Sequence, residues 1–462
     1  MHGGSNIERQ ADVVVAGAGI AGVSTAFHLA ARFGVGRVVI CDPRPPLTLT
    51  SDKSTECYRN WWPGPGSAMV DLMNRSIDLL ETWADENDNL FHLSRRGYLY
   101  VTAEPNRLTA MEQEAREISA LGAGELRIHR GASDDPAYQE AAPDGFKEAA
   151  RGADLFTDGN ALRRQFPYLS ANAVGGLHAR RAGWFSAQQL GTWLLDRARS
   201  AGAELVADSV VAVDTADGRL RSVRLASGAS IRTAHFVNAA GPLVGEVGTM
   251  TGVDLPVFSE VHRKISFADS RSALPRSAPV LIWNDGQNID WTSEEREGLL
   301  ADPELAFLVE RLGAGAHCRP EGSDEAATVL GLWEYHKDVR FPTFPIPEDR
   351  LYPEIVLRGL ATMVPSIGGY LEKLPQPYID GGYYTKTREN RPLIGPAGPE
   401  GSVVVGALSG YGVMAAAAAG ELGATHVTGG SLPDYARWFA PGRYEDPEYL
   451  ELLEQMTDSG QI

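Results

Sequence analysis

Cysteine is scarce in this chain of 462 residues, which contains only Cys41, Cys57 and Cys318. No two of them share a CxxC spacing, which argues against a disulfide framework and a structural zinc site. Long apolar runs are also lacking, because no stretch reaches the roughly 18 residues of a membrane span. The polar start MHGGSNIERQ contains no apolar core of a signal peptide. We therefore expect a cytoplasmic protein without a membrane anchor or a bound metal.

Positively charged residues are fewer than negatively charged ones. The chain has 42 Lys and Arg against 60 Asp and Glu, a formal net charge of −18. Such a surface repels the phosphate backbone of a nucleic acid. The length exceeds one typical hydrophobic core and suggests two domains. The composition therefore favours an enzyme with small-molecule substrates over a nucleic-acid-binding protein.

A glycine-rich loop stands between a β-branched run and an alanine-rich helical segment in DVVVAGAGIAGVSTAFHLAARFG, residues 12–34. Gly17 permits a tight turn, Gly19 lets a pyrophosphate approach the backbone, and Gly22 lets helix and strand pack closely. A second run, RVVICD, ends in Asp42, which suits a ribose hydroxyl of FAD or NAD better than the 2′-phosphate of NADP. The predicted cofactor contacts in this region are Gly17, Ala18, Gly19, Ile20, Ala21, Gly22, Asp42, Pro43, Ser54 and Thr55.

Residues 203–241 alternate apolar and polar side chains around an Asp-Gly turn, which predicts a β-meander that returns to the nucleotide sheet at FVNAAG. Val210 and Val211 are expected to cover an adenine edge, with ordinary strand core as the alternative. Ala240 and Gly241 are expected at the cofactor.

Helical spacing of apolar residues predicts packing helices over 66–87 and 186–202. The charged, irregular stretch at about 275–329 indicates a solvated insertion.

Three separated blocks make the chain similar to the D-amino-acid oxidase superfamily of flavoproteins, especially the branch of sarcosine oxidase, glycine oxidase and dimethylglycine dehydrogenase. They are GAGIAG, FVNAAGP, and GGYYTKTRENRPLIGP with GALSGYGVMAAAAAGELGA. The resemblance implies an α/β fold, with a Rossmann-type, glutathione-reductase-like FAD-binding domain and a substrate domain on a mainly antiparallel sheet. It implies FAD-binding segments at 1–92, 151–257 and 381–462, and substrate segments at 93–150 and 258–380.

In that family a strand ends in a glycine-rich turn at the flavin pyrimidine ring, where the positive end of a helix favours the anionic reduced flavin. The residues that match this turn are Gly406, Ser409, Gly410, Tyr411, Gly412, Val413 and Met414.

Covalent flavin attachment occurs in the superfamily at two known positions. The sarcosine-oxidase pattern has its linking cysteine where this chain has Gly382, and the dimethylglycine-dehydrogenase pattern has a histidine in the first loop, which here contains none. The resemblance therefore implies a dissociable FAD, with Cys57 a small buried neighbour of the site and a direct contact of flavin or substrate as the alternative.

The same resemblance implies oxidation of the C–N bond of a secondary or N-substituted amine or amino acid to an imine, by hydride transfer to flavin N5. Its substrate residues fall in TECYRNWWPG, residues 55–64. Arg59 matches the family arginine for the substrate carboxylate, with a structural arginine as the alternative. Glu56 replaces a second family arginine, which indicates a cationic substrate or an internal ion pair. Trp61 and Trp62 are expected to form an apolar or cation–π wall.

The roof over the flavin is expected from VLGLWEYH, residues 329–336, where sarcosine oxidases carry a lysine for oxygen activation and this chain has none before Lys337. Strand side chains alternate, so either Trp333 and Tyr335 or their neighbours face the flavin. His262, on another expected roof strand, is a third candidate. The predicted catalytic residues are Arg59, Tyr335, His262 and Tyr411, and the predicted substrate-binding residues are Glu56, Trp61, Trp62 and Trp333.

Three alternatives to an oxidase stay open. The missing lysine favours a dehydrogenase that passes electrons to an acceptor other than oxygen. A flavin-binding subunit of a hetero-oligomeric oxidoreductase is the second alternative, and an NAD-only dehydrogenase is the third. The expected partners are a small amine or amino-acid substrate, oxygen or another electron acceptor, and further subunits in a homo- or hetero-oligomer.

Overall fold

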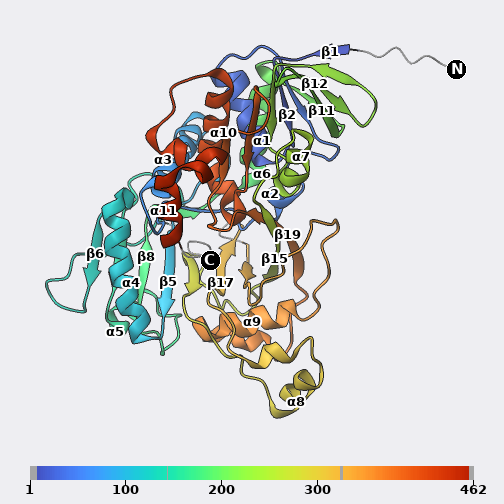
Figure 1. Cartoon of the computed structure of the whole chain (residues 1–462). Helices are drawn as coiled ribbons and strands as arrows, with labels where there is room; N and C mark the ends of the chain where they lie inside the picture. Colours follow the sequence, from blue (N-terminus) through green and yellow to red (C-terminus); the bar gives the residue numbers. More distant parts are fainter. Residues whose placement is uncertain (1–7, 143, 323–325, 457–462) are drawn as a thin grey trace.

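Two large sheets of different construction organise the chain, whose computed structural model describes residues 8–142, 144–322 and 326–456. In Figure 1 the mainly parallel sheet lies in the upper part with helices α1, α3 and α10, and the mainly antiparallel sheet lies in the lower part above helix α9. None of the helices in these ranges is long and apolar enough to cross a membrane.

The first sheet has six strands in the order β10-β3-β2-β14-β21-β20, and all neighbours are parallel except β20 and β21. Both of its faces are covered, so β2 and β3 are continuous apolar runs, as in the fully buried VVVA of β2. The strands are β2 (Val13–Ala16), β3 (Val38–Cys41), β10 (Glu204–Val206), β14 (His235–Asn238), β20 (Leu393–Pro396) and β21 (Ser402–Gly406).

Helix α1 (Ile20–Phe27) packs against α10 (Gly412–Thr428) and α6 (Ala187–Ser200), and α3 (Ala68–Glu86) packs on α10. The two helices predicted from apolar spacing are therefore confirmed as α3 and α6. Close packing of α1 on α10 depends on Gly420, because a Cβ there would lie 2.4 Å from the Ser24 hydroxyl.

A four-stranded sheet with the order β1-β13-β12-β11 flanks the six-stranded sheet. Its strands are β1 (Glu8–Gln10), β11 (Val210–Ala216), β12 (Arg219–Leu225) and β13 (Ser230–Arg232). The chain then enters β14, beside β2. The predicted meander and its return to the nucleotide sheet are thus confirmed.

The second large sheet has nine strands in the order β19-β15-β18-β17-β16-β5-β8-β7-β6, antiparallel except for the pairs β16–β5 and β6–β7. Its antiparallel character confirms the predicted fold class. The strands are β5 (Tyr98–Thr102), β6 (Leu126–His129), β7 (Ala153–Phe156), β8 (Gly175–Ala179), β15 (Phe258–Ala268), β16 (Val280–Trp283), β17 (His317–Glu321), β18 (Thr328–Leu332) and β19 (Tyr378–Lys386).

Short elements connect these layers. Helix α2 (Thr50–Lys53) leads into β4 (Cys57–Arg59), which pairs with β9 (Ala182–Trp184). The remaining α-helices are α4 (Pro105–Ile118), α5 (Gly159–Gln165), α7 (Val244–Met250), α8 (Ser293–Ala301), α9 (Tyr352–Met363) and α11 (Pro447–Gln455).

Two details differ from the expectations. Strands β7 and β8 belong to the nine-stranded sheet, although the predicted boundaries assign 151–257 to the FAD-binding domain. Strands β16 and β17 are buried members of the same sheet, although 275–329 was expected to be a solvated insertion. The full domain division stays a prediction, and its residues 1–7, 143, 323–325 and 457–462 lie outside the described residues.

Candidate active site

A cavity of about 860 Å³, open to solvent, lies where β2, β14 and β21 end. Its position, at the carboxyl ends of parallel strands, is where such sheets bind nucleotides. Of the predicted cofactor contacts, those that line it are Gly17, Gly19, Ile20, Ala21, Asp42, Ser54, Ala240, Gly241, Gly406, Ser409, Gly410, Gly412 and Val413.

The glycines of the first loop differ in what surrounds them. Gly17 has φ +104°, and a Cβ there would lie 2.4 Å from the Ala239 carbonyl oxygen. A Cβ on Gly22 would lie 2.0 Å from the Gly17 carbonyl oxygen. Gly19 would meet only the Ser51 hydroxyl, at 3.3 Å, so its backbone is exposed to the cavity. These are the three tasks that a dinucleotide loop requires, and the residues fit FAD.

Asp42 is held in place by the backbone on both sides. Its carboxylate accepts hydrogen bonds from Ala18 N at 2.8 Å and from Arg44 N at 2.9 Å. The Ser51 hydroxyl accepts from Ile20 N at 2.9 Å, at the start of α1. Loop and acid are therefore fixed relative to one another, and the acid still lines the cavity.

Helix α10 also begins at this cavity. Its 17 residues start at Gly412, and both Gly412 and Val413 line the cavity. The unpaired N–H groups of such a helix start carry a partial positive charge. This end of the cavity therefore favours a ligand that gains negative charge.

A second cavity, the chamber, has a volume of about 510 Å³ and adjoins the first. Tyr384 and Gly410 line both of them. The chamber is lined by Thr55, Cys57, Arg59, Trp62, Tyr98, Ile282, His317, Leu332, Tyr384, Gly410, Tyr411 and Met414.

Arg59 is only 5% exposed and lies in the chamber between aromatic rings. Its guanidinium carbon is 4.4 Å from the Trp62 ring centroid and 5.5 Å from that of Tyr98, which are cation–π distances. The Trp62 indole donates to the Arg59 carbonyl at 3.2 Å and meets Tyr411 edge-on at 5.1 Å. The arginine predicted from the loop is therefore held at a chamber wall by side chains from three segments.

Tyr411 and His317 supply polar groups in neutral form. The Tyr411 hydroxyl donates to the Asn390 carbonyl at 2.9 Å, and burial raises its pKa. Burial lowers the pKa of His317 to about 4, so this imidazole is neutral at pH 7. Its Nδ1 lies 2.7 Å from the Gly315 carbonyl, which can only accept. Nδ1 therefore carries the proton, and Nε2 is the acceptor.

His262 lies behind the chamber wall. Its ring stacks on Tyr384, with centroids 3.9 Å apart and planes at 21°. Its nitrogens lie 3.3 Å from Glu334 and 3.5 Å from Glu260. Burial acts to raise the pKa of Glu260, but hydrogen bonds from His262 and Lys386 lower it to about 2. His262 therefore contacts the shared wall without lining either cavity.

Glu56 forms an internal ion pair, the second of the alternatives expected for it. Its carboxylate accepts from Ala187 N at 2.8 Å and lies 3.7 Å from Arg319. Burial raises the pKa of Glu56. Trp61 is buried in the main hydrophobic core rather than on the chamber wall.

The expected roles of Trp333 and Tyr335 are not supported by their positions. Strand β18 ends at Leu332, which lines the chamber, so strand alternation no longer orients the residues that follow. The Trp333 indole donates to the Gly313 carbonyl at 3.0 Å, and the Tyr335 hydroxyl donates to Asp349 at 2.9 Å. Both side chains belong to the core of the second sheet.

Val210 and Val211 also lie elsewhere. They open β11 in the flanking sheet, and Val211 is 47% exposed. Two roles were expected for this pair, adenine cover and strand core, and Val210 has the second. Ala18, Gly22 and Pro43 adjoin the cofactor cavity through their neighbours without lining it. Thr55, Tyr411 and Met414 line the chamber.

Sequence reasoning missed the wall residues Tyr98, Ile282, His317 and Tyr384, which lie on β5, β16, β17 and β19. The apolar run VLIW at 280–283 was the available sign of β16. No local pattern indicates His317, because its short strand HCRPE follows the glycine-rich LGAGA and does not alternate apolar and polar residues. The catalytic and binding roles of all these residues stay predictions.

Comparison with known proteins adds the family. The model of the FAD dependent oxidoreductases (DAO) matches residues 12–425. Mitochondrial dimethylglycine dehydrogenase of Mus musculus is 24% identical over 441 residues, which are 94% of this chain and 44% of that protein. The Homo sapiens protein is 25% identical over 298 residues, 64% of this chain and 30% of its own length. The chain thus spans less than half the length of these relatives.

Solved structures share the fold. L-proline dehydrogenase from P. horikoshii superposes with a TM-score of 0.72 at 18% identity, covering 95% of this chain and 99% of the other. Glycine oxidase from Geobacillus kaustophilus gives 0.71 at 16% identity, covering 94% and 98%. A family match over most of the chain, on a cavity that fits the cofactor, shows that this protein belongs to the DAO family of FAD-dependent oxidoreductases.

Proposed function

We propose that the protein oxidises the C–N bond of a secondary or N-substituted amine that carries a carboxylate, giving an imine that water hydrolyses. The observation that carries this proposal is the buried Arg59 guanidinium, in a chamber that adjoins the FAD cavity. A guanidinium binds a carboxylate through two parallel hydrogen bonds, and burial strengthens that pairing. FAD, when bound, accepts the hydride equivalent that leaves the carbon next to nitrogen.

The chain's own residues bind and orient the substrate. Arg59 holds the carboxylate, and the rings of Trp62, Tyr98, Tyr384 and Tyr411 enclose the rest of the molecule. No Asp or Glu is found among the described residues that line the chamber, so the wall offers no counter-charge to an ammonium. The neutral His317, with Nε2 as acceptor, suits an amine N–H.

A dehydrogenase that uses an acceptor other than oxygen is the second candidate. The described lining of the chamber contains no lysine, and Leu332 ends β18 there. Stopped-flow mixing of the reduced protein with oxygen separates the two candidates. Fast reoxidation supports an oxidase, and slow reoxidation supports a dehydrogenase.

An anaerobic screen of flavin bleaching tests the proposed reaction. The panel pairs N-alkyl amino acids with the same amines lacking the carboxylate, and we expect bleaching by the acid of each pair only. Equal bleaching by both members would contradict the role of Arg59. Absence of bleaching across the panel would remove the catalytic proposal and favour a flavin-binding subunit. Acid precipitation of the same sample should release FAD into the supernatant, since the attachment is predicted to be non-covalent.

A further inference from the structure

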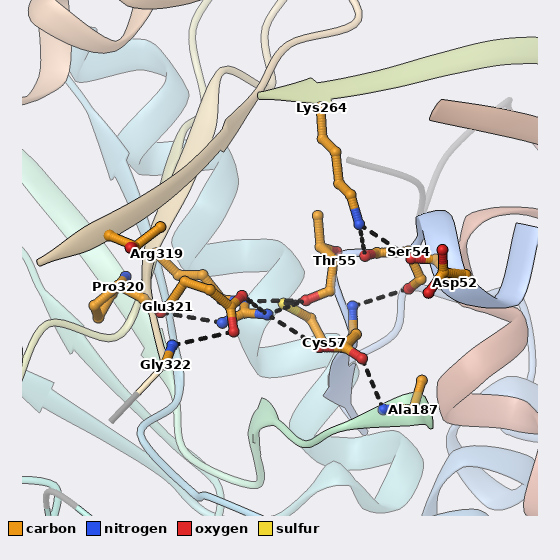
Figure 2. Close-up of polar contacts among 12 residues, drawn as sticks. Asp52, Ser54, Thr55, Cys57, Ala187, Lys264, Arg319, Pro320, Glu321 and Gly322 are labelled. Atoms are coloured by element: carbon orange, nitrogen blue, oxygen red, sulfur yellow. Dashed lines mark hydrogen bonds and ion pairs between the residues drawn. The ribbon is translucent and has the colours of Figure 1, made fainter. Parts of the chain in front are cut away.

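The backbone of residues 52–55 lies where the cofactor cavity meets the chamber. Ser54 lines the first and Thr55 lines the second. Figure 2 shows two cationic side chains from the nine-stranded sheet, Lys264 of β15 and Arg319 of β17, reaching this segment. Neither is part of the proposed chemistry, and both contact backbone carbonyl oxygens.

Lys264 donates to the Ser54 carbonyl at 2.8 Å and to the Asp52 carbonyl at 3.3 Å. Burial lowers the pKa of Lys264, and the carboxylates of Asp380, Glu56 and Asp52 oppose that effect. The ammonium group therefore binds the end of α2 and the residue that follows it.

Arg319 is 1% exposed and directs two of its N–H groups at a single oxygen. Nε and Nη2 donate to the Thr55 carbonyl at 3.0 and 2.8 Å, and the Cys57 thiol donates to the same oxygen at 3.2 Å. Its charge is balanced by Glu321 at 2.7 Å and Glu56 at 3.7 Å. An oxygen that accepts three donors can be rotated only at the cost of several hydrogen bonds.

These contacts determine where the amides point. In a trans peptide N–H and C=O are antiparallel, so the Thr55 N–H points away from Lys264. The Glu56 N–H is used internally, since it donates to the Ser54 hydroxyl at 2.9 Å. Glu56 itself has φ +61°, a left-handed conformation that is uncommon for this residue type. Such a conformation persists where the surroundings impose it. Here the Glu56 side chain is held by the hydrogen bond from Ala187 N and by the ion pair with Arg319.

We infer that Lys264 and Arg319 are positioning residues, which hold the 52–55 backbone so that the Thr55 amide is turned towards the junction of the two cavities. This inference rests on FAD as the family's cofactor. A fixed N–H donor stabilises a bound group that gains negative charge on reduction. The two residues therefore raise the reduction potential of bound FAD.

The potential of FAD bound to Lys264→Met tests the first cation, by reductive titration of the holoprotein without any amine. We expect the equilibrium to move about tenfold towards oxidised flavin, which is about 30 mV for two electrons. Lys264→Arg should restore the potential. Lys147→Met is the charge-matched control, because the exposed Lys147 amine pairs with Asp85 at 2.9 Å and not with the 52–55 segment. An unchanged potential in Lys264→Met, or an equal shift in Lys147→Met, would overturn the inference.

Arg319→Lys tests the second cation, because lysine keeps the charge and loses the paired donation to Thr55. We expect FAD to dissociate at least fivefold more readily and the visible flavin spectrum to shift. The same affinity and spectrum as the unsubstituted protein would remove Arg319 from the inference. Because neither measurement uses a substrate, a failed amine screen would sink the proposed reaction and leave these results standing.

Discussion

The cofactor cavity and the chamber share a wall, yet they differ in how much of their lining is backbone and how much is side chain. The cavity is bounded by backbone and glycines at the ends of β2, β14 and β21, together with larger side chains such as Arg44, Tyr383 and Tyr384. The chamber is bounded by large aromatic and aliphatic side chains with Arg59 and His317 among them. Added atoms are excluded at the close approaches of Gly17 and Gly22 beside the cavity, whereas the chamber changes character when one side chain is exchanged.

The largest effect is expected for Gly22→Ala, which tests the backbone packing of the glycine loop at the cofactor cavity. The new Cβ would lie 2.0 Å from the Gly17 carbonyl oxygen, so loop and helix must separate. We expect the free energy of unfolding to fall by more than about 4 kcal/mol, the range of exceptional single substitutions, together with loss of FAD. Denaturant unfolding and flavin content measure both. Gly298→Ala in α8 is the control, because its Cβ meets nothing within 4 Å. Comparable losses in the two variants would show that the crowding is not decisive.

Arg59→Met tests the chamber, whose wall consists of side chains. Removing one partner of a buried charge pair costs about 2 to 4 kcal/mol, so kcat/KM for a carboxylated amine should fall roughly 30- to 1000-fold with FAD content unchanged. The exposed Arg197, whose guanidinium carbon lies 5.6 Å from the Trp193 ring centroid, provides a matched control. Arg197→Met should leave kcat/KM unaltered. A fall that is equally large for amines without a carboxylate would show that Arg59 acts on the fold.

His317 gives the chamber a pH dependence of stability. Burial lowers its pKa from 6.5 to about 4 in the folded chain. The unfolded chain therefore binds the extra proton first, and the contribution of His317 is complete above pH 6.5 and is lost as the pH falls towards 4. We expect about 2 to 3 kcal/mol less stability at pH 4 from this residue. His317→Gln should reduce the slope of unfolding free energy against pH in that window. A slope equal to that of the unsubstituted protein would show that His317 titrates normally.

The smallest effect is expected for Tyr335→Phe, outside both cavities. It removes the hydrogen bond to Asp349, which is worth about 1 kcal/mol of stability. The value of kcat/KM should not change, because the side chain packs in the core of the second sheet. A tenfold drop in kcat/KM would restore the catalytic role predicted from strand alternation.

The cofactor cavity and the chamber also differ in how far the sequence predicts them. Gly17, Gly19 and Asp42 act through backbone conformation and short-range order, which a sequence displays directly. Tyr98, Ile282 and His317 meet because β5, β16 and β17 are neighbours in one sheet. That pairing is a long-range property, and no local pattern in the sequence determines it. The cofactor half of the site could therefore be predicted and much of the chamber could not.

The end of strand β18 limited the prediction for the residues that follow it. Alternation predicts that Trp333 and Tyr335 share a face, and it holds only while the strand continues. Because β18 ends at Leu332, the chain turns and both rings enter the core. Glu56 shows the opposite case, since its change of sign from the family pattern correctly indicated an internal ion pair as one of two possibilities.

The place of β21 in the first sheet affects how the protein matures during synthesis. Residues 402–406 pair with β14, and Val413 closes the cavity that begins at Gly17. Ribosomes release a chain from its N-terminus, and folding follows that order. The glycine loop therefore emerges almost 400 residues before its last wall. The complete cavity for FAD can therefore form only after the chain has been synthesised beyond Val413.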